Sequence, residues 1–159
     1  MEGIRTLLKT DSRRDTVALG KRLGHLLRPG DVVALVGDLG SGKTTFAKGL
    51  AVGLGVESEN AVKSPTYVLM HIYQGNCPVY HLDLFRLDST PEVENIGWDD
   101  LLTGEGVVLI EWAKKIDGYL PSHYLEIEIK SLGETVREFC FRPRGERFKA
   151  LIKELAGEK

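Results

Sequence analysis

The segment Gly37–Thr44 constrains this chain more than any other part of its sequence. It reads Gly-Asp-Leu-Gly-Ser-Gly-Lys-Thr, fits the pattern G-x-x-x-x-G-K-S/T at every fixed position, and follows an apolar run at 32–36. Glycines allow the tight turn that points successive backbone N–H groups at a phosphate, and a following helix adds its positive dipole end. We therefore predict a phosphate-binding loop between a strand and a helix that runs from Lys43 to about Leu54.

The loop pattern assigns roles to its own residues. Lys43 is expected to reach the β- and γ-phosphates of a nucleotide, and the Thr44 hydroxyl is expected to ligate Mg²⁺. The predicted nucleotide-binding residues of the loop are Gly37, Asp38, Leu39, Gly40, Ser41, Gly42, Lys43, Thr44 and Thr45. The sequence has no N-K-x-D segment of the kind that reads guanine, which favours ATP over GTP as the ligand.

Two segments with strand character end on an acidic residue. Glu111 directly follows the apolar run 107–110, which is the pattern of a Walker B strand, and Asp83 closes the segment 80–83. Mg²⁺ prefers hard oxygen ligands, and ligands of open α/β sheets bind at the carboxyl ends of strands. We assign Glu111 to the metal or its water shell, and Asp83 to a metal-bound water or the attacking water. The predicted metal site is Thr44, Glu111 and Asp83, and the predicted catalytic residues are Lys43, Asp83 and Glu111. The alternative, that each acid caps a neighbouring element, stays open.

Three further polar residues lie near these segments in the sequence. Ser64 and Thr66 flank Pro65 and offer hydroxyls that suit the sensing of a γ-phosphate, as in a switch segment; a strand entry with ordinary capping hydroxyls is the alternative. Arg86 follows Asp83 closely, and it either neutralises charge on the γ-phosphate or pairs with a nearby acid.

Hairpin patterns indicate an α/β fold with a mixed sheet. The first hairpin is expected from two segments rich in strand formers, Tyr67–Tyr73 and Val79–Leu84, which are separated by a short loop. The second is expected from two segments in which apolar and polar residues alternate, Tyr124–Lys130 and Val136–Arg142, which are also separated by a short loop. A small-molecule kinase built on a parallel sheet would place a helix between successive strands, so the first hairpin argues against that class.

The remaining elements are predicted from periodicity and capping. We expect a strand at 4–8, a helix after Asp11 or Ser12 that reaches Leu27, one or two short helices within 88–102, a strand buried on both faces at 107–110, and an amphipathic helix at 147–156.

Length and charge limit the functional classes. The 159 residues suit a single domain over 1–159, and a net charge of −2 gives no general attraction to polyanions, so nucleic-acid contact would need a local patch. The one basic cluster that stands out is Arg142, Arg144, Arg147 and Lys149. The two cysteines are far apart and are expected to be free thiols, and the absence of a signal-like or 18-residue apolar segment predicts a cytoplasmic protein.

Four segments taken in order resemble the TsaE (YjeE) family, the bacterial ATPases of tRNA threonylcarbamoyladenosine biosynthesis. They are the loop at 37–45, Ser-Pro-Thr-Tyr at 64–67, Tyr-His-Leu-Asp-Leu-Phe-Arg-Leu at 80–87 and Ile-Glu-Trp at 110–112, within a likeness that runs from about Thr16 to Pro121. Ser41 replaces a frequent alanine of the family and Phe85 a common tyrosine, so no hydroxyl role is expected at 85.

The resemblance implies a P-loop NTPase-like three-layer sandwich with a parallel core and antiparallel hairpins, a Mg²⁺-ATP site, and an accessory role in the threonylcarbamoylation of adenosine 37 of tRNA. Members act on the TsaD and TsaB subunits of the transferase complex. By this likeness Thr44 and Glu111 hold the metal, Lys43 the phosphates, and Asp83 is needed for hydrolysis. The candidates for the adenine pocket are Ser12, Thr16 and Arg137.

Two other functions remain open from the sequence. The chain could be a non-catalytic nucleotide-dependent switch, with Ser64 and Thr66 reporting the γ-phosphate to a partner, or a small-molecule kinase, which the first hairpin disfavours. The leading interpretation is an ATPase that is weak alone and dependent on protein partners. Direct contact between its basic cluster and tRNA is possible but less favoured.

Overall fold

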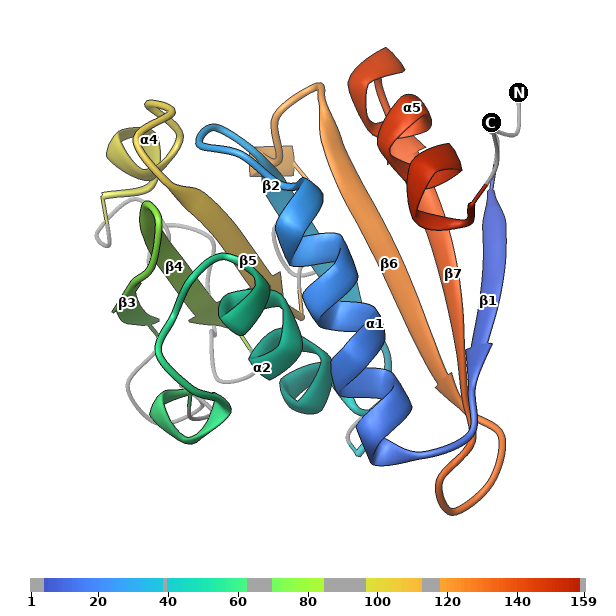
Figure 1. Cartoon of the computed structure of the whole chain (residues 1–159). Helices are drawn as coiled ribbons and strands as arrows, with labels where there is room; N and C mark the ends of the chain where they lie inside the picture. Colours follow the sequence, from blue (N-terminus) through green and yellow to red (C-terminus); the bar gives the residue numbers. More distant parts are fainter. Residues whose placement is uncertain (1–4, 39, 63–69, 85–96, 113–117, 158–159) are drawn as a thin grey trace.

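The strand that precedes the glycine-rich loop lies at the centre of a seven-stranded sheet (Figure 1). The computed structural model describes residues 5–38, 40–62, 70–84, 97–112 and 118–157. The strands are β1 (Thr6–Thr10), β2 (Val32–Val36), β3 (Met70–Gln74), β4 (Pro78–Asp83), β5 (Val107–Glu111), β6 (Tyr124–Ser131) and β7 (Arg137–Arg144). The helices are α1 (Arg13–Leu26), α2 (Lys43–Gly53), α4 (Trp98–Leu101) and α5 (Glu146–Leu155), with a short 3-10 turn at Glu59–Ala61.

The sheet is mixed, as the hairpin patterns predict. Its strand order is β1-β7-β6-β2-β5-β4-β3. β2 pairs in parallel with β5 and β6, and β5 pairs in parallel with β4, whereas β3–β4, β6–β7 and β1–β7 are antiparallel. The carboxyl ends of β2, β4, β5 and β6 therefore meet at one edge of the sheet, and the glycine-rich loop leaves β2 at that edge.

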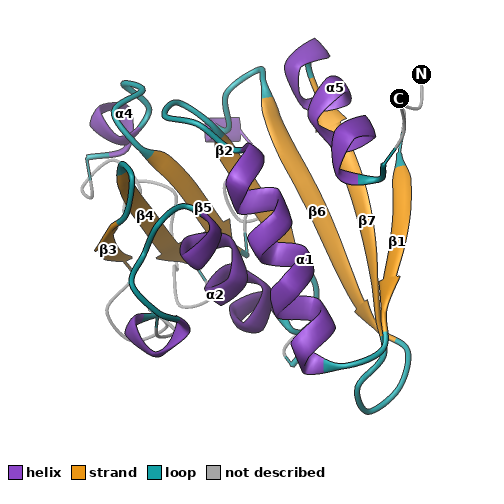
Figure 2. Cartoon of the chain, in the orientation of Figure 1, coloured by secondary structure: helices purple, strands orange, loops and turns teal. Residues whose placement is uncertain are grey.

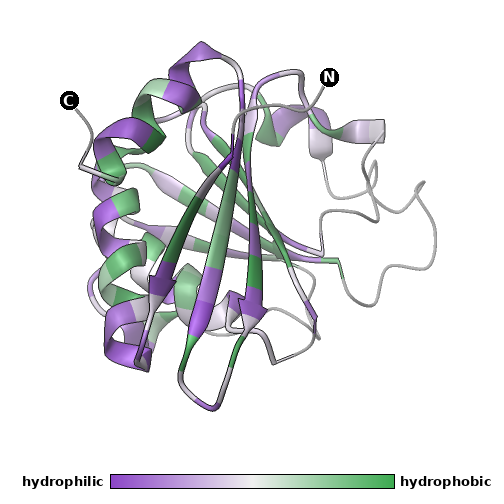
Figure 3. Ribbon diagram, turned by 90° about the vertical axis from the view of Figure 1, so that its right-hand side faces the viewer, coloured by the Kyte–Doolittle hydropathy of each residue, from purple (hydrophilic) through white to green (hydrophobic). Residues whose placement is uncertain are grey.

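Helices cover the sheet on both faces, which makes a three-layer α/β fold and confirms the predicted fold class (Figure 2). Because side chains alternate along a strand, Val33 and Leu35 of β2 point into the core beneath α1, α2 and α5, while Val32 and Ala34 point into a second core beneath α4. The side view separates the layers, with α1, α2 and α5 on one side of the sheet and α4 on the other (Figure 3). Strand β5 is buried along its whole length, as its apolar run predicts.

Glycines allow α1 and α2 to pack in very close contact. A Cβ at Gly20 would lie 2.6 Å from the Phe46 carbonyl oxygen, and one at Gly49 would overlap the Val17 carbonyl oxygen. Gly24 and Gly53 meet the opposite helix in the same way. This contact fixes α2, and with it the loop at its N-terminus, against α1.

Several boundaries differ from the predicted ones. The first strand spans Thr6–Thr10 rather than 4–8, because its pairing with β7 continues to Thr10 opposite Arg137, and residues 1–4 lie outside the described part. Ser12, and not Asp11, caps α1 by accepting a hydrogen bond from the Asp15 N–H. Of the short helices expected within 88–102, α4 is the one described, since residues 85–96 lie outside the described part.

Two simpler features complete the description. Cys77 and Cys140 are both free, as expected. Within the residues that the structure describes, no helix is both long enough and apolar enough to cross a membrane.

Candidate functional site

The loop after β2 has the backbone that a phosphate site requires. Gly40 and Gly42 have φ angles of 80° and 107°, a region that glycine enters without a steric penalty. Gly42 is the N-cap of α2 and brings no capping side chain, so the amides of the first helical turn have no acceptor within the helix. Together with the helix dipole, these amides form a site that favours an anion.

The Lys43 side chain is hydrogen-bonded to the backbone of the loop. Its Nζ donates hydrogen bonds to the carbonyl oxygens of Gly37 at 2.7 Å and Asp38 at 2.9 Å, and it lies 4.2 Å from the centre of the Trp112 ring. Burial lowers the pKa of Lys43, and the negative charges of Glu111, Asp83 and Asp38 oppose that shift. The amine of this first residue of α2 thus lies against the backbone of the loop, where it can pair with a phosphate.

Thr44, Glu111 and Asp83 converge next to the loop. The Thr44 hydroxyl donates to Glu111 Oε1 and Oε2 at 3.3 and 3.4 Å, and Asp83 lies directly opposite Glu111 in the β4–β5 register. Both acidic residues are buried, each with 2% of its whole surface exposed. They converge because parallel strands β4 and β5 end at the same edge of the sheet.

These three oxygen-bearing side chains fit a Mg²⁺ ion that is shared with a ligand. Hydroxyl and carboxylate oxygens are the donors that Mg²⁺ prefers, and the ion normally keeps waters and binds substrate phosphates rather than a full set of protein ligands. Within the described part of the chain, no group of three or more His, Cys, Asp or Glu residues is arranged to hold a metal ion by itself.

The structure adds a residue to this site that the sequence analysis did not assign. His81 on β4 is fully buried, and its Nε2 lies 2.6 Å from Glu111 Oε2. On the far side of its ring, Nδ1 lies 3.4 Å from the Tyr73 hydroxyl of β3. One signal is present in the sequence, since His81 and Asp83 are two residues apart on a strand and must share a face.

A cavity of about 220 Å³ borders the opposite side of the loop. It is lined by Arg13, Thr16, Gly42, Thr45, Glu134, Thr135 and Arg137. The Arg137 side chain lies over Gly42, where a Cβ would be 3.4 Å from its Nε, and its Nη1 donates to the Gly133 and Val136 carbonyls at 3.0 Å. Thr16 and Arg137, two of the adenine-pocket candidates, are therefore brought together here. The third, Ser12, is not among the lining residues and caps α1 instead.

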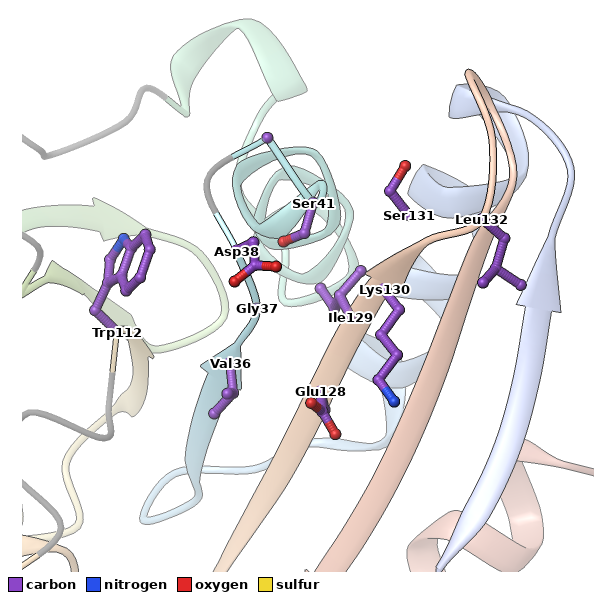
Figure 4. A pocket seen from close by; sticks show the side chains of 11 residues that line it. Val36, Gly37, Asp38, Ser41, Trp112, Glu128, Ile129, Lys130, Ser131 and Leu132 are labelled. Atoms are coloured by element: carbon purple, nitrogen blue, oxygen red, sulfur yellow. The ribbon is translucent and has the colours of Figure 1, made fainter.

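A larger cavity of about 640 Å³ lies between the loop and the end of β6 (Figure 4). Figure 4 shows Trp112 on one side of Asp38 and Ser41, and the side chains of Ile129 to Leu132 on the other. This end of β6 belongs to the site, although Arg137 on β7 was the only residue of this hairpin that was predicted there. It does so because β6 pairs with β2 in parallel, a pairing for which the sequence carries no local signal.

Four of the predicted functional residues cannot be placed. Leu39, Ser64, Thr66 and Arg86 lie outside the described residues.

The basic cluster predicted near the C-terminus is largely paired with acids. Arg142 contacts Glu126 at 3.2 Å and Glu128 at 3.1 Å, Arg147 contacts Asp31 at 2.5 Å, and Lys149 contacts Glu146 at 3.1 Å. Three of its four positive charges are thus already balanced within the fold. This pairing argues against the cluster as a surface for nucleic acid.

Comparisons with known proteins identify the family to which the chain is similar. Residues 10–139 match the family model described as "Threonylcarbamoyl adenosine biosynthesis protein TsaE". Two curated proteins named "tRNA threonylcarbamoyladenosine biosynthesis protein TsaE" are similar to the chain. That of Bacillus subtilis is 42% identical over 149 residues, which cover 93% of this chain and 92% of the relative. That of Treponema pallidum is 40% identical over 127 residues, 80% of this chain and 93% of the relative. The crystal structure of Bacillus subtilis YdiB superposes with a TM-score of 0.81 at 35% identity, covering 99% of this chain and 97% of that one.

Proposed function

The chain belongs to the TsaE family, and from that premise we propose that it is a Mg²⁺-dependent ATPase required for the threonylcarbamoylation of adenosine 37 in tRNA. The observation that carries the proposal is the convergence of Lys43, Thr44, Glu111 and Asp83 at the N-terminus of α2. A phosphate-binding loop beside paired carboxylates is the arrangement that phosphoryl-transfer proteins use.

The layout of the loop supports one orientation of ATP. Thr44 faces Glu111 on β5, whereas the next residue, Thr45, lines the smaller cavity on the opposite side of α2. A triphosphate that crosses the helix N-terminus then has its γ-phosphate near Glu111 and its α-phosphate near Thr45. The adenine base is then assigned to the cavity lined by Thr16 and Arg137, because this cavity adjoins Thr45. The cavity beside β6 is larger but does not include Thr45.

In this arrangement each side chain has a separate task. Lys43 binds the β- and γ-phosphates, Thr44 and Glu111 hold Mg²⁺, and Asp83 orients the attacking water. The bound ion supplies charge neutralisation at the phosphate oxygens. The two carboxylates are buried, so their hydrogen bonds act in a medium of low dielectric constant, where they are stronger than in water.

The family and the charge distribution support a dependence on protein partners. The relatives' printed names place those proteins in the biosynthesis of a modified tRNA nucleoside. Most of the basic cluster of this chain is paired internally, so we propose that tRNA is bound by partner subunits, TsaB and TsaD, on which the chain acts. Cytoplasmic localisation stays a prediction.

Reconstitution of the modification tests this proposal. Unmodified tRNA is incubated with TsaB, TsaD, the enzyme that supplies the threonylcarbamoyl donor, ATP and this chain, and the nucleosides are analysed by mass spectrometry. We expect N6-threonylcarbamoyladenosine to accumulate only when the chain is present and to be lost with Lys43→Ala. Equal accumulation with Lys43→Ala would refute the role of the loop.

A further inference from the structure

A buried histidine lies behind the Glu111 carboxylate, and the proposed function gives it no task. His81 has no exposed side-chain surface, and Glu111 retains 3%. The distance of 2.6 Å between His81 Nε2 and Glu111 Oε2 is slightly shorter than the usual range of about 2.7–3.2 Å for N–H···O hydrogen bonds. A polar side chain is rarely placed at such depth without hydrogen-bond partners; Nε2 of His81 has a close one in Glu111, and Nδ1 has a more distant one in the Tyr73 hydroxyl.

The chemistry of the carboxylate sets the direction of the short hydrogen bond. An ionised carboxylate oxygen can only accept, so His81 Nε2 carries a hydrogen and donates it to Glu111. On the other side of the ring, Nδ1 lies 3.4 Å from the Tyr73 hydroxyl, a longer contact, so the hydrogen bond that orients the ring is the one to Glu111.

The lengths of the two contacts on Glu111 differ in a way that separates their roles. The contact to His81 is short, whereas Thr44 Oγ1 lies 3.3 and 3.4 Å from the two carboxylate oxygens, longer than an ordinary O–H···O hydrogen bond. The carboxylate is therefore held from behind by His81. The Thr44 hydroxyl is held only weakly and is available to another ligand at the mouth of the site.

We propose that His81 is a positioning residue, which uses its Nε2–H to fix the Glu111 carboxylate in the orientation needed beside Thr44. The expected effect on hydrolysis rests on the proposed ATPase function. The orientation of Glu111 by the His81 Nε2–H does not. Groups that orient a ligating side chain from outside typically change affinity or activity by about 10- to 100-fold when removed.

The first test needs neither nucleotide nor metal. Long-range ¹⁵N–¹H NMR of the labelled protein reports which nitrogen of each of the four histidines carries a hydrogen, and the signal lost in His81→Gln identifies His81. We expect His81 with a protonated Nε2. A His81 that carries hydrogen on Nδ1 alone would overturn the proposal, whatever the chain does with ATP.

The second test compares two substitutions that differ in which nitrogen they replace. The amide of His81→Gln reaches the place of Nε2, whereas that of His81→Asn reaches only the place of Nδ1. For partner-stimulated ATP hydrolysis we expect His81→Asn to lower kcat by about 10- to 100-fold with little change in KM, and His81→Gln to restore most of that loss. His71→Asn is the matched control, because His71 faces His81 across the β3–β4 hairpin and is half-buried.

Equal losses in the Asn and Gln variants, or an unchanged kcat in His81→Asn, would overturn the proposal. Thermal unfolding of each variant shows whether it folds, and the NMR signal of His81 is assigned from whichever of the two variants does. If the unmodified chain itself shows no partner-stimulated hydrolysis, the proposed function fails. The NMR measurement still decides whether Nε2 of His81 carries the hydrogen that it donates to Glu111.

Discussion

Removal of the Arg147 guanidinium tests how α5 is attached to the rest of the fold. Arg147 donates from Nε to Asp31 Oδ1 at 2.9 Å and from Nη2 to Asp31 Oδ2 at 2.5 Å, a two-point contact between α5 and the residue before β2. The hydrogen bond to Asp31 raises the pKa of Arg147 above its usual value. In Arg147→Met the Asp31 carboxylate, with 6% of its side chain exposed, keeps the Arg28 N–H as a hydrogen-bond donor.

The expected loss follows from burial. Breaking a buried ion pair by removing one partner costs about 3–5 kcal/mol. Because 30% of the Arg147 side chain is exposed, water screens this pair, and we expect Arg147→Met to lower the free energy of unfolding by about 2–3 kcal/mol. For a chain of this size that corresponds to a decrease in Tm of about 4–12 °C.

The same helix provides the control. Lys149 pairs with Glu146, whose side chain is 90% exposed, and such surface pairs contribute about 0–1 kcal/mol. Urea unfolding of the unmodified chain, Arg147→Met and Lys149→Met under identical conditions measures the difference. If Arg147→Met proves no more destabilising than Lys149→Met, the reasoning from burial is wrong.

Three further predictions concern the loop and its support. Gly49→Ala should destabilise the chain by about 1–3 kcal/mol, measured by urea unfolding, because the added methyl overlaps the Val17 carbonyl and forces α1 and α2 apart; an unchanged midpoint would contradict the packing. Arg137→Ala should weaken binding of ATP but not of inorganic tripolyphosphate in competition titrations, because Arg137 lines the cavity assigned to the base; equal weakening of both would place Arg137 on the phosphates. The folded state lowers the pKa of Lys43 from 10.5, so burial of its charge opposes folding below that lowered pKa, and this cost fades as pH rises from there to 10.5. The stability of the unmodified chain relative to Lys43→Met should therefore increase over that interval, and a decrease would show that the folded state favours the charged amine.

Local patterns in the sequence were enough to predict the fold class. The apolar run at 32–36, the glycines after it and the helix from Lys43 are consecutive, so their geometry depends on residues close in sequence. The two hairpins were found for the same reason. Glu111 was selected because it ends an apolar strand, and the structure places it within reach of Thr44.

Features that depend on strand register or on distant pairing were missed. The contact between His81 and Glu111 exists because β4 and β5 pair in one register, which places residues 30 positions apart next to each other. The end of β6 borders the loop only because β6 joins β2 in parallel. Likewise, the basic residues near the C-terminus form a cluster in sequence, but the acidic partners of Arg142 and Arg147 come from β6 and from Asp31.

The most direct test of the central claim is steady-state Mg²⁺-dependent ATP hydrolysis by the purified chain, alone and with TsaB and TsaD, with Glu111→Ala as the control. We predict slow hydrolysis by the chain alone, strong stimulation by the partners, and loss of that stimulation in Glu111→Ala. Fast hydrolysis that is indifferent to the partners, or stimulation that survives in Glu111→Ala, would contradict a partner-activated ATPase built on this site.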